Sequence, residues 1–214
     1  WKSDRVKYAA FNADGSVFDT PLQIEAGDKD SSARYPADGF QIVELPYRGD
    51  ALSMQVILPM RADGLAKVEA MLDAKHLEQW NAALVARKVD VALPKFRMDT
   101  SFELSPMLQQ LGMTRAFVNP ADKSGGAQFD GISASEDPAQ RLFIGAVVHK
   151  AFVAVDEKGT EAAAATAVMM VAGAAMPMMV DFTPVFRADR GFIFLIRDQQ
   201  TGTVLFLGRL VRPS

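Results

Sequence analysis

The stretch that decides the fold is Val147–Thr166, which reads VVHKAFVAVDEKGTEAAAAT. In its first half, apolar residues such as Val148, Ala151 and Val153 lie on both sides of His149 and Lys150, so the sequence predicts a long strand from Ile144 to Val155. After Asp156 the pattern changes to small residues, and no charged residue occurs between Glu161 and Asp181. The fold must therefore accommodate a strand that runs directly into a long, uncharged segment.

This uncharged segment fits neither a membrane span nor an ordinary surface helix. It is rich in alanine, contains Pro177 and has acidic rather than basic flanks, all of which disfavour membrane insertion. It also lacks the polar face of a surface helix. Small residues tolerate exposure in a loop and also fit a crowded sheet, where Gly159–Gly173 would span about 50 Å. The composition therefore predicts a segment that exists both as a loop and as a strand.

Length, charge and cysteine content exclude several classes of protein. The chain has 214 residues, of which 49% are hydrophobic, and this is enough to bury a core. Its 23 Lys+Arg and 26 Asp+Glu give a net charge of −3, so a nucleic-acid partner is not expected. The absence of cysteine excludes disulfides, thiolate metal sites and a cysteine nucleophile.

Two β-hairpins are expected in the rest of the chain. The first runs from Phe40 to Pro59 around a turn at Arg48-Gly49-Asp50. The second, from Phe192 to Val211, is so apolar that burial on both faces is predicted. The class is therefore α+β, with antiparallel sheets dominating the second half.

Helical spacing appears in two places. Leu65–Leu84 has apolar residues three and four apart, which predicts one or two amphipathic helices. A shorter helix carrying Leu108 is expected to be capped by Thr100 or Ser101 and to end at Gly112.

Several segments carry a resemblance to one protein family. Val147–Thr166 closely resembles the hinge signature of the serpins, and Phe186–Asp198 with Phe206–Pro213 is similar to the closing hairpin of that family. Further landmarks match in order: Asp38–Pro59, Leu93–Phe96, Leu111–Met113 and Ala116-Phe117. The chain is identified as a member of the serpin family, of the bacterial kind, from about Tyr35 to Pro213.

The resemblance implies a serpin-like α+β fold of mainly antiparallel sheets, a few helices and an exposed reactive-centre loop at residues 157–179. Because family members are much longer, residues 1–214 are expected to be a single serpin domain that is incomplete at the N-terminus. The missing N-terminal half would be a structural partner, and the complete protein a monomer. Trp1 is expected at the top of the central sheet and His149 in the core beneath it.

The resemblance also implies a function as a suicide-substrate inhibitor of serine proteases. A target protease would cut the loop, which would then insert into the central sheet and trap the acyl-enzyme. Insertion requires small hinge residues, and the hinge by resemblance comprises Glu157, Gly159, Thr160, Glu161, Ala162, Ala163, Ala164 and Ala165. The alternative is a non-inhibitory, serpin-like binding or carrier protein whose loop is cut without inserting.

Counting along the loop by resemblance places the reactive bond at Gly173-Ala174. Ala172 and Met176 remain candidates, although Pro177 disfavours cleavage after Met176. These small or apolar residues indicate an elastase-like or subtilisin-like target, or a cysteine protease. The family and its targets imply an extracellular or periplasmic location.

No catalytic, cofactor or metal site is expected. His149 is one of only two histidines and has no serine nucleophile motif beside it, so a structural role is favoured over catalysis. Asp156, Glu157 and Glu161 do not form a convergent metal-binding set. The methionines of the loop are interpreted as part of an exposed segment that a protease recognises, and not as ligands of a soft metal.

Overall fold

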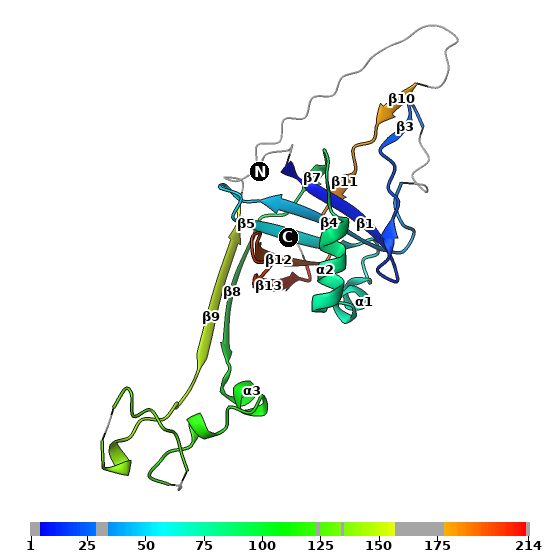
Figure 1. The fold of residues 1–214 in the computed structure, drawn as a ribbon. Helices are drawn as coiled ribbons and strands as arrows, with labels where there is room; N and C mark the ends of the chain where they lie inside the picture. Colours follow the sequence, from blue (N-terminus) through cyan, green and yellow to red (C-terminus); the bar gives the residue numbers. More distant parts are fainter. Residues whose placement is uncertain (1–4, 29–33, 123–124, 134, 157–177, 213–214) are drawn as a thin grey trace. The chain divides into compact units, whose positions relative to one another are not determined.

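A computed structural model of the protein describes residues 5–28, 34–122, 125–133, 135–156 and 178–212. The chain divides into two compact units. One comprises Trp1–Lys95 with Asp156–Ser214, and the other comprises Phe96–Val155. Figure 1 shows the sheets and helices of each unit, and each is described by itself below.

A seven-stranded sheet forms the centre of the first unit. Its strand order is β13-β12-β5-β4-β1-β2, with β6 beside β1, and every neighbouring pair is antiparallel. The strands are β1 Lys7–Asn12, β2 Val17–Phe18, β4 Gly39–Pro46, β5 Leu52–Pro59, β6 Val85–Ala86, β12 Phe192–Asp198 and β13 Val204–Leu210. This sheet confirms the prediction of an α+β fold dominated by antiparallel strands.

The predicted hairpin from Phe40 to Pro59 is confirmed as β4 and β5. The two strands pair in one continuous register from Phe40 opposite Pro59 to Pro46 opposite Ser53. The turn contains Gly49 at φ 91° and Asp50 at φ 59°. Glycine adopts this left-handed conformation without steric cost, which explains the Gly-Asp sequence at the turn.

Two helices pack on one face of this sheet (Figure 1): α1, Leu65–Ala70, and α2, Ala74–Ala83. The carboxylate of Asp73 caps α2 by accepting a hydrogen bond of 2.8 Å from the backbone N–H of His76. Trp80 on α2 is 1% exposed, and its ring lies 4.8 Å from that of Phe40 and 6.0 Å from that of Phe11. These rings bury the amphipathic face that the apolar spacing predicts.

A buried polar cluster lies further along the same face of the sheet. The carboxylate of Glu44 is 3% exposed and accepts hydrogen bonds from Lys7 Nζ at 2.7 Å and from Gln55 Nε2 at 2.6 Å. Arg197 Nη1 lies 3.7 Å from the same carboxylate. The cluster therefore joins side chains from β1, β4, β5 and β12.

The closing hairpin forms, but its burial differs from the prediction. β12 is buried from Phe192 to Leu195, whereas Val204–Leu207 on β13 are exposed by 39–56%. The reason is that β12 lies between β5 and β13, while β13 is an edge strand of the sheet. The prediction of burial on both faces is therefore correct for β12 and wrong for β13 in the part of the chain that is described.

The second unit is built on a two-stranded antiparallel ribbon of β8, Phe96–Glu103, and β9, Val148–Val155. Between them lie α3, Ser105–Gln110, and two short 3₁₀ turns, Arg115–Phe117 and Pro138–Gln140. The predicted helix cap is wrong, because Thr100 and Ser101 belong to β8 and the N-cap of α3 is Leu104. Gly112, at φ 100°, follows the end of α3, in the left-handed conformation expected there.

Candidate functional site

The described structure shows the two ends of the predicted reactive loop. β9 ends at Val155, two residues before the loop begins, and the described chain resumes at Met178. The predicted hinge and reactive-bond residues lie outside the described residues: Glu157, Gly159, Thr160, Glu161, Ala162, Ala163, Ala164, Ala165, Ala172, Gly173, Ala174 and Met176. Trp1 also lies outside them. The structure therefore describes the segments that anchor the two ends of the loop.

The strand before the loop has one apolar and one charged face. Residues directly opposite each other in an antiparallel pair point to the same side. Phe102 opposite His149 and Met98 opposite Val153 form the apolar side, whereas Arg97 lies on the other side, with its guanidinium 4.7 Å from the ring of Phe152. The predicted strand Ile144–Val155 forms over Val148–Val155, and exposure alternates along it from Ala151 to Val155.

His149 does not lie in a core within the described part of the chain. It is on the apolar side of the ribbon, but it is exposed, as is its neighbour Phe102. The place of His149 in a core beneath the central sheet of the complete fold therefore stays a prediction. Burial needs a layer packed against the ribbon, which a strand pattern does not report.

The segment after the loop is held by a second strand pair. β10, Met179–Asp181, runs antiparallel to β3, Gln23–Glu25. The backbone N–H of Ala26 donates to the carbonyl of Met178 at 2.7 Å, and that of Phe182 donates to the carbonyl of Leu22 at 2.8 Å. Gln23 Nε2 also donates to Asp181 Oδ1 at 3.2 Å. The C-terminal end of the loop is thus tied to a segment more than 150 residues earlier.

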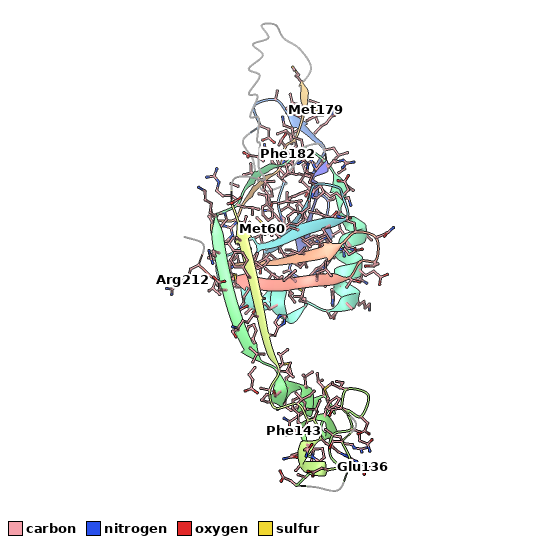
Figure 2. The ribbon with its side chains drawn as sticks, turned by 90° about the vertical axis from the view of Figure 1, so that its left-hand side faces the viewer. Met60, Glu136, Phe143, Met179, Phe182 and Arg212 are labelled. Carbon is pink, nitrogen blue, oxygen red and sulfur yellow. The ribbon has the colours of Figure 1, made fainter. Side chains whose placement is uncertain are left out.

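Phe182 is the centre of this anchor, and Figure 2 shows it between Met179 and the strands of the main sheet. Its ring is 9% exposed and lies 5.6 Å from the guanidinium of Arg34 and 5.9 Å from that of Arg87. Tyr35 meets it edge to face at 5.9 Å. The faces of aromatic rings attract cations, so these contacts favour a fixed position for Phe182.

Arg87 links the anchor to the main sheet. Its Nη2 donates to the carbonyls of Phe182 at 2.8 Å and Pro21 at 3.0 Å, and its guanidinium lies 6.0 Å from the ring of Tyr8 on β1. Burial lowers the pKa of Arg87 and raises the pKa of Tyr8 above its usual range. At neutral pH the cation therefore faces a neutral phenol and two carbonyl oxygens.

A third strand pair continues the anchor. β11, Val185–Arg187, runs parallel to β7, Asp90–Ala92, and the side chain of Phe186 is fully buried. The backbone N–H of Val185 donates to the hydroxyl of Tyr35 at 2.8 Å. Sequence reasoning missed this anchor, since its contacts join residues far apart in the chain. Its only local signal is an aromatic residue, Phe182, immediately after a charged one.

The described residues contain neither a metal-binding cluster nor a membrane-spanning helix. Among them there is no group of three His, Asp or Glu side chains that could hold a metal ion. None of the helices in these ranges has the length and apolar character needed to cross a membrane.

Comparison with known proteins identifies the class to which this arrangement belongs. A family model described as Serpin (serine protease inhibitor) matches residues 26–213. The chain belongs to the serpin family, which confirms the family and fold predicted from the hinge sequence.

Individual relatives agree with this assignment. An uncharacterized serpin-like protein of Thermococcus kodakarensis is 39% identical over the whole chain, and leukocyte elastase inhibitor of Sus scrofa is 41% identical over 81% of it. A solved structure of thyroxine-binding globulin in complex with thyroxine covers 82% of the chain, with a TM-score of 0.61 and 28% identity. The chain spans 46%, 43% and 41%, respectively, of the lengths of these three proteins.

Proposed function

We propose that the protein inhibits serine proteases as a suicide substrate. In the first step the active-site serine of the target attacks the carbonyl of Gly173. The peptide bond to Ala174 breaks, an ester to Gly173 forms, and Ala174 leaves with a proton as the new amino terminus. The freed segment then inserts beside β9 and distorts the protease before water can cleave the ester. Family membership supports this proposal at the level of protease inhibition.

The strand pairing of β9 supports the insertion step. In the described residues one edge of β9 pairs with β8, and the inserted segment would pair with the other edge. Such an edge is a template for an added strand. The eight residues of β9 span about 26 Å, whereas Gly159–Gly173 reaches about 50 Å when extended. The loop is therefore long enough to turn and pair along all of β9.

The composition of the hinge supports insertion over simple cleavage. Thr160 and Ala162–Ala165 have small side chains that can enter a sheet interior at little steric cost. A long charged side chain there would be removed from water on insertion, and this desolvation would cost roughly several kcal/mol of free energy. We therefore assign inhibition, and not substrate behaviour, to this loop.

The residues around the reactive bond define the kind of target. Gly173-Ala174 is the proposed bond, with Ala172 and Met176 as alternatives. No Lys or Arg occurs between Lys158 and Arg187, so a trypsin-like target is disfavoured. An elastase-like or subtilisin-like protease, or a cysteine protease of similar preference, would fit this sequence. Such targets accord with an extracellular or periplasmic location, which is part of the proposal.

The second candidate function is that of a binding or carrier protein whose loop is cut without inserting. It is favoured by the structural similarity to thyroxine-binding globulin, a protein seen in complex with thyroxine. The two functions differ in the product of the reaction with a protease. An inhibitor remains covalently bound to the enzyme, whereas a carrier protein is released as cleaved chains.

The test is incubation of the natural polypeptide that carries this sequence with pancreatic elastase and, separately, with subtilisin. A band of summed mass that survives denaturing electrophoresis is expected for an inhibitor. Mass spectrometry of this band after digestion should place the ester on Gly173 or a neighbouring candidate. Only clipped protein, with full protease activity remaining, would exclude the inhibitory mechanism.

A pair of variants tests the hinge separately. Thr160→Arg should convert the protein from inhibitor to substrate, because the arginine cannot be buried without a partner. Met178→Arg is the matched control, since Met178 follows the reactive bond, is 46% exposed and does not take part in insertion. Covalent complex formation by the Thr160→Arg variant at the level of the control would refute the role of the hinge.

A further inference from the structure

A cavity of about 500 Å³ lies beside the loop anchor. Its lining comes from three segments of the first unit, residues 22–23, 87–88 and 181–183. These segments lie at the start of β3, just after β6 and at the end of β10, so the cavity exists only because distant parts of the sequence meet there. Its volume is that of a site for a small organic molecule.

Two cations line this cavity without a carboxylate partner among the described residues. Arg87 donates to the two backbone carbonyls noted above, and neither carries a full charge. Lys88 is exposed, and no ion pair involves it in the described ranges. A partly buried guanidinium without a counterion is costly, and an incoming anion would offset part of that cost.

Apart from Thr183, the rest of the lining is apolar or already paired. Leu22 is 70% exposed, and the ring of Phe182 is held by Arg34 and Arg87, as described above. The one carboxylate, that of Asp181, accepts a hydrogen bond from Gln23. It would repel a second negative charge on a ligand.

We propose that this cavity binds a small organic monoanion. Its carboxylate contacts Arg87 and Lys88, and its aromatic or aliphatic body packs on Leu22 and Phe182. The negative charge of Asp181 selects against dianions. This site does not depend on the inhibitory mechanism, because binding is measured without any protease.

The probe for this site is 2-naphthoate, compared with its neutral analogue 2-naphthamide by isothermal titration calorimetry on the natural polypeptide. 2-Naphthoate is expected to bind once per chain with a dissociation constant of about 1 mM or lower. The amide should bind at least about tenfold more weakly, because it cannot form a charge-assisted hydrogen bond. Hydrogen exchange should slow on binding at residues 22–23, 87–88 and 181–183.

Three variants and a control locate the site. Arg87→Gln should lower the affinity at least about tenfold. Because Arg87 also holds the anchor, the circular dichroism spectrum of the Arg87→Gln variant is compared with that of the parent protein to check that the variant folds. Lys88→Gln and Leu22→Asp alter exposed side chains and should each weaken binding about two- to fivefold. Lys75→Gln, which changes an exposed lysine on α2 away from the cavity, should have no effect.

Several results would overturn the proposal. These are equal binding of the acid and the amide, absence of binding at concentrations tenfold above the expected constant, and unchanged affinity in both the Lys88→Gln and Leu22→Asp variants. If Arg87→Gln does not fold, these last two variants still decide the question. Slowed exchange confined to other residues would also reject this cavity as the site.

Discussion

Replacement of Glu44 by glutamine should destabilise the folded protein at neutral pH by about 2–4 kcal/mol. The carboxylate of Glu44 is 3% exposed and lies between Lys7 Nζ at 2.7 Å and Arg197 Nη1 at 3.7 Å. Glutamine would keep the shape and part of the hydrogen bonding but remove the charge. Arg197, whose side chain is 15% exposed, would then lack a carboxylate partner among the described residues.

The size of the effect follows from the unequal exposure of the two cations. Removal of one partner of a fully buried ion pair costs roughly 3–5 kcal/mol. Lys7 is 42% exposed and can regain water, so its share of that cost is small. The larger share comes from Arg197. The Glu44→Gln variant is therefore expected to lose an amount of unfolding free energy at or somewhat below the range for a fully buried ion pair.

The loss should also depend on pH. Burial by itself raises the pKa of Glu44, but hydrogen bonds from Lys7, Gln55 and Gln199 outweigh it and hold the pKa below its usual value. A carboxylate with a lowered pKa in the folded state stabilises the protein above its unfolded-state pKa. This contribution is lost as the pH falls through the folded-state pKa. The difference between parent and variant should therefore be full at pH 7 and should narrow below about pH 4.

The assay is urea unfolding at pH 7 and at pH 3, followed by the fluorescence of Trp80, which is 1% exposed. A Trp1→Phe background removes the other tryptophan of the chain. Glu69→Gln is the matched control: Glu69 pairs with Arg209 at 3.0 Å, but both side chains are partly exposed, so its loss should stay below about 1 kcal/mol. Equal losses for Glu44→Gln and Glu69→Gln, or a Glu44→Gln loss that is the same at both pH values, would refute the reasoning.

Three further predictions test other parts of the structure. Asp73→Ala should lower stability by about 1 kcal/mol in thermal melts, because it removes the side-chain cap of α2; an unchanged melting temperature would contradict this role. Gly208→Ala should cost about 1–3 kcal/mol, since its new Cβ would lie 2.6 Å from Cζ of buried Phe194, whereas Gly131→Ala, with open space around it, should be neutral. Phe182→Ala should speed amide exchange in β10 by about 2- to 30-fold through loss of the arginine contacts, and unchanged exchange would show that the strand pairing alone holds the anchor.

Local patterns determine much of this fold. The turn at Gly49 and Asp50 sets the β4–β5 hairpin, because few residues adopt its left-handed backbone. Apolar spacing over Leu65–Leu84 predicts the helical region, and Val68 and Trp80 are indeed buried in it. The segment Val147–Thr166 identifies the family through its resemblance to the serpin hinge signature. Each of these signals depends on residues close together in the chain.

Other features depend on which strands become neighbours. β12 and β13 are similarly apolar, yet β12 is buried and β13 is exposed because one lies inside the sheet and the other at its edge. His149 lies on the same side of the ribbon as Met98 and Val153, yet it is exposed in the described structure. Strand alternation reports the direction of a side chain and not what lies beyond it.

By itself, the sequence determined the family and the hairpins, because a family motif, a strand's period and a left-handed turn are local properties of the chain. Only the tertiary structure decided the anchor around Phe182 and the cavity beside it. Arg34 and Tyr35 approach this ring from one segment and Arg87 approaches it from another. The carbonyl of Leu22 accepts a hydrogen bond from the backbone N–H of Phe182, beside the pairing of β3 with β10. Such a site arises from long-range pairing of strands, which no local pattern encodes.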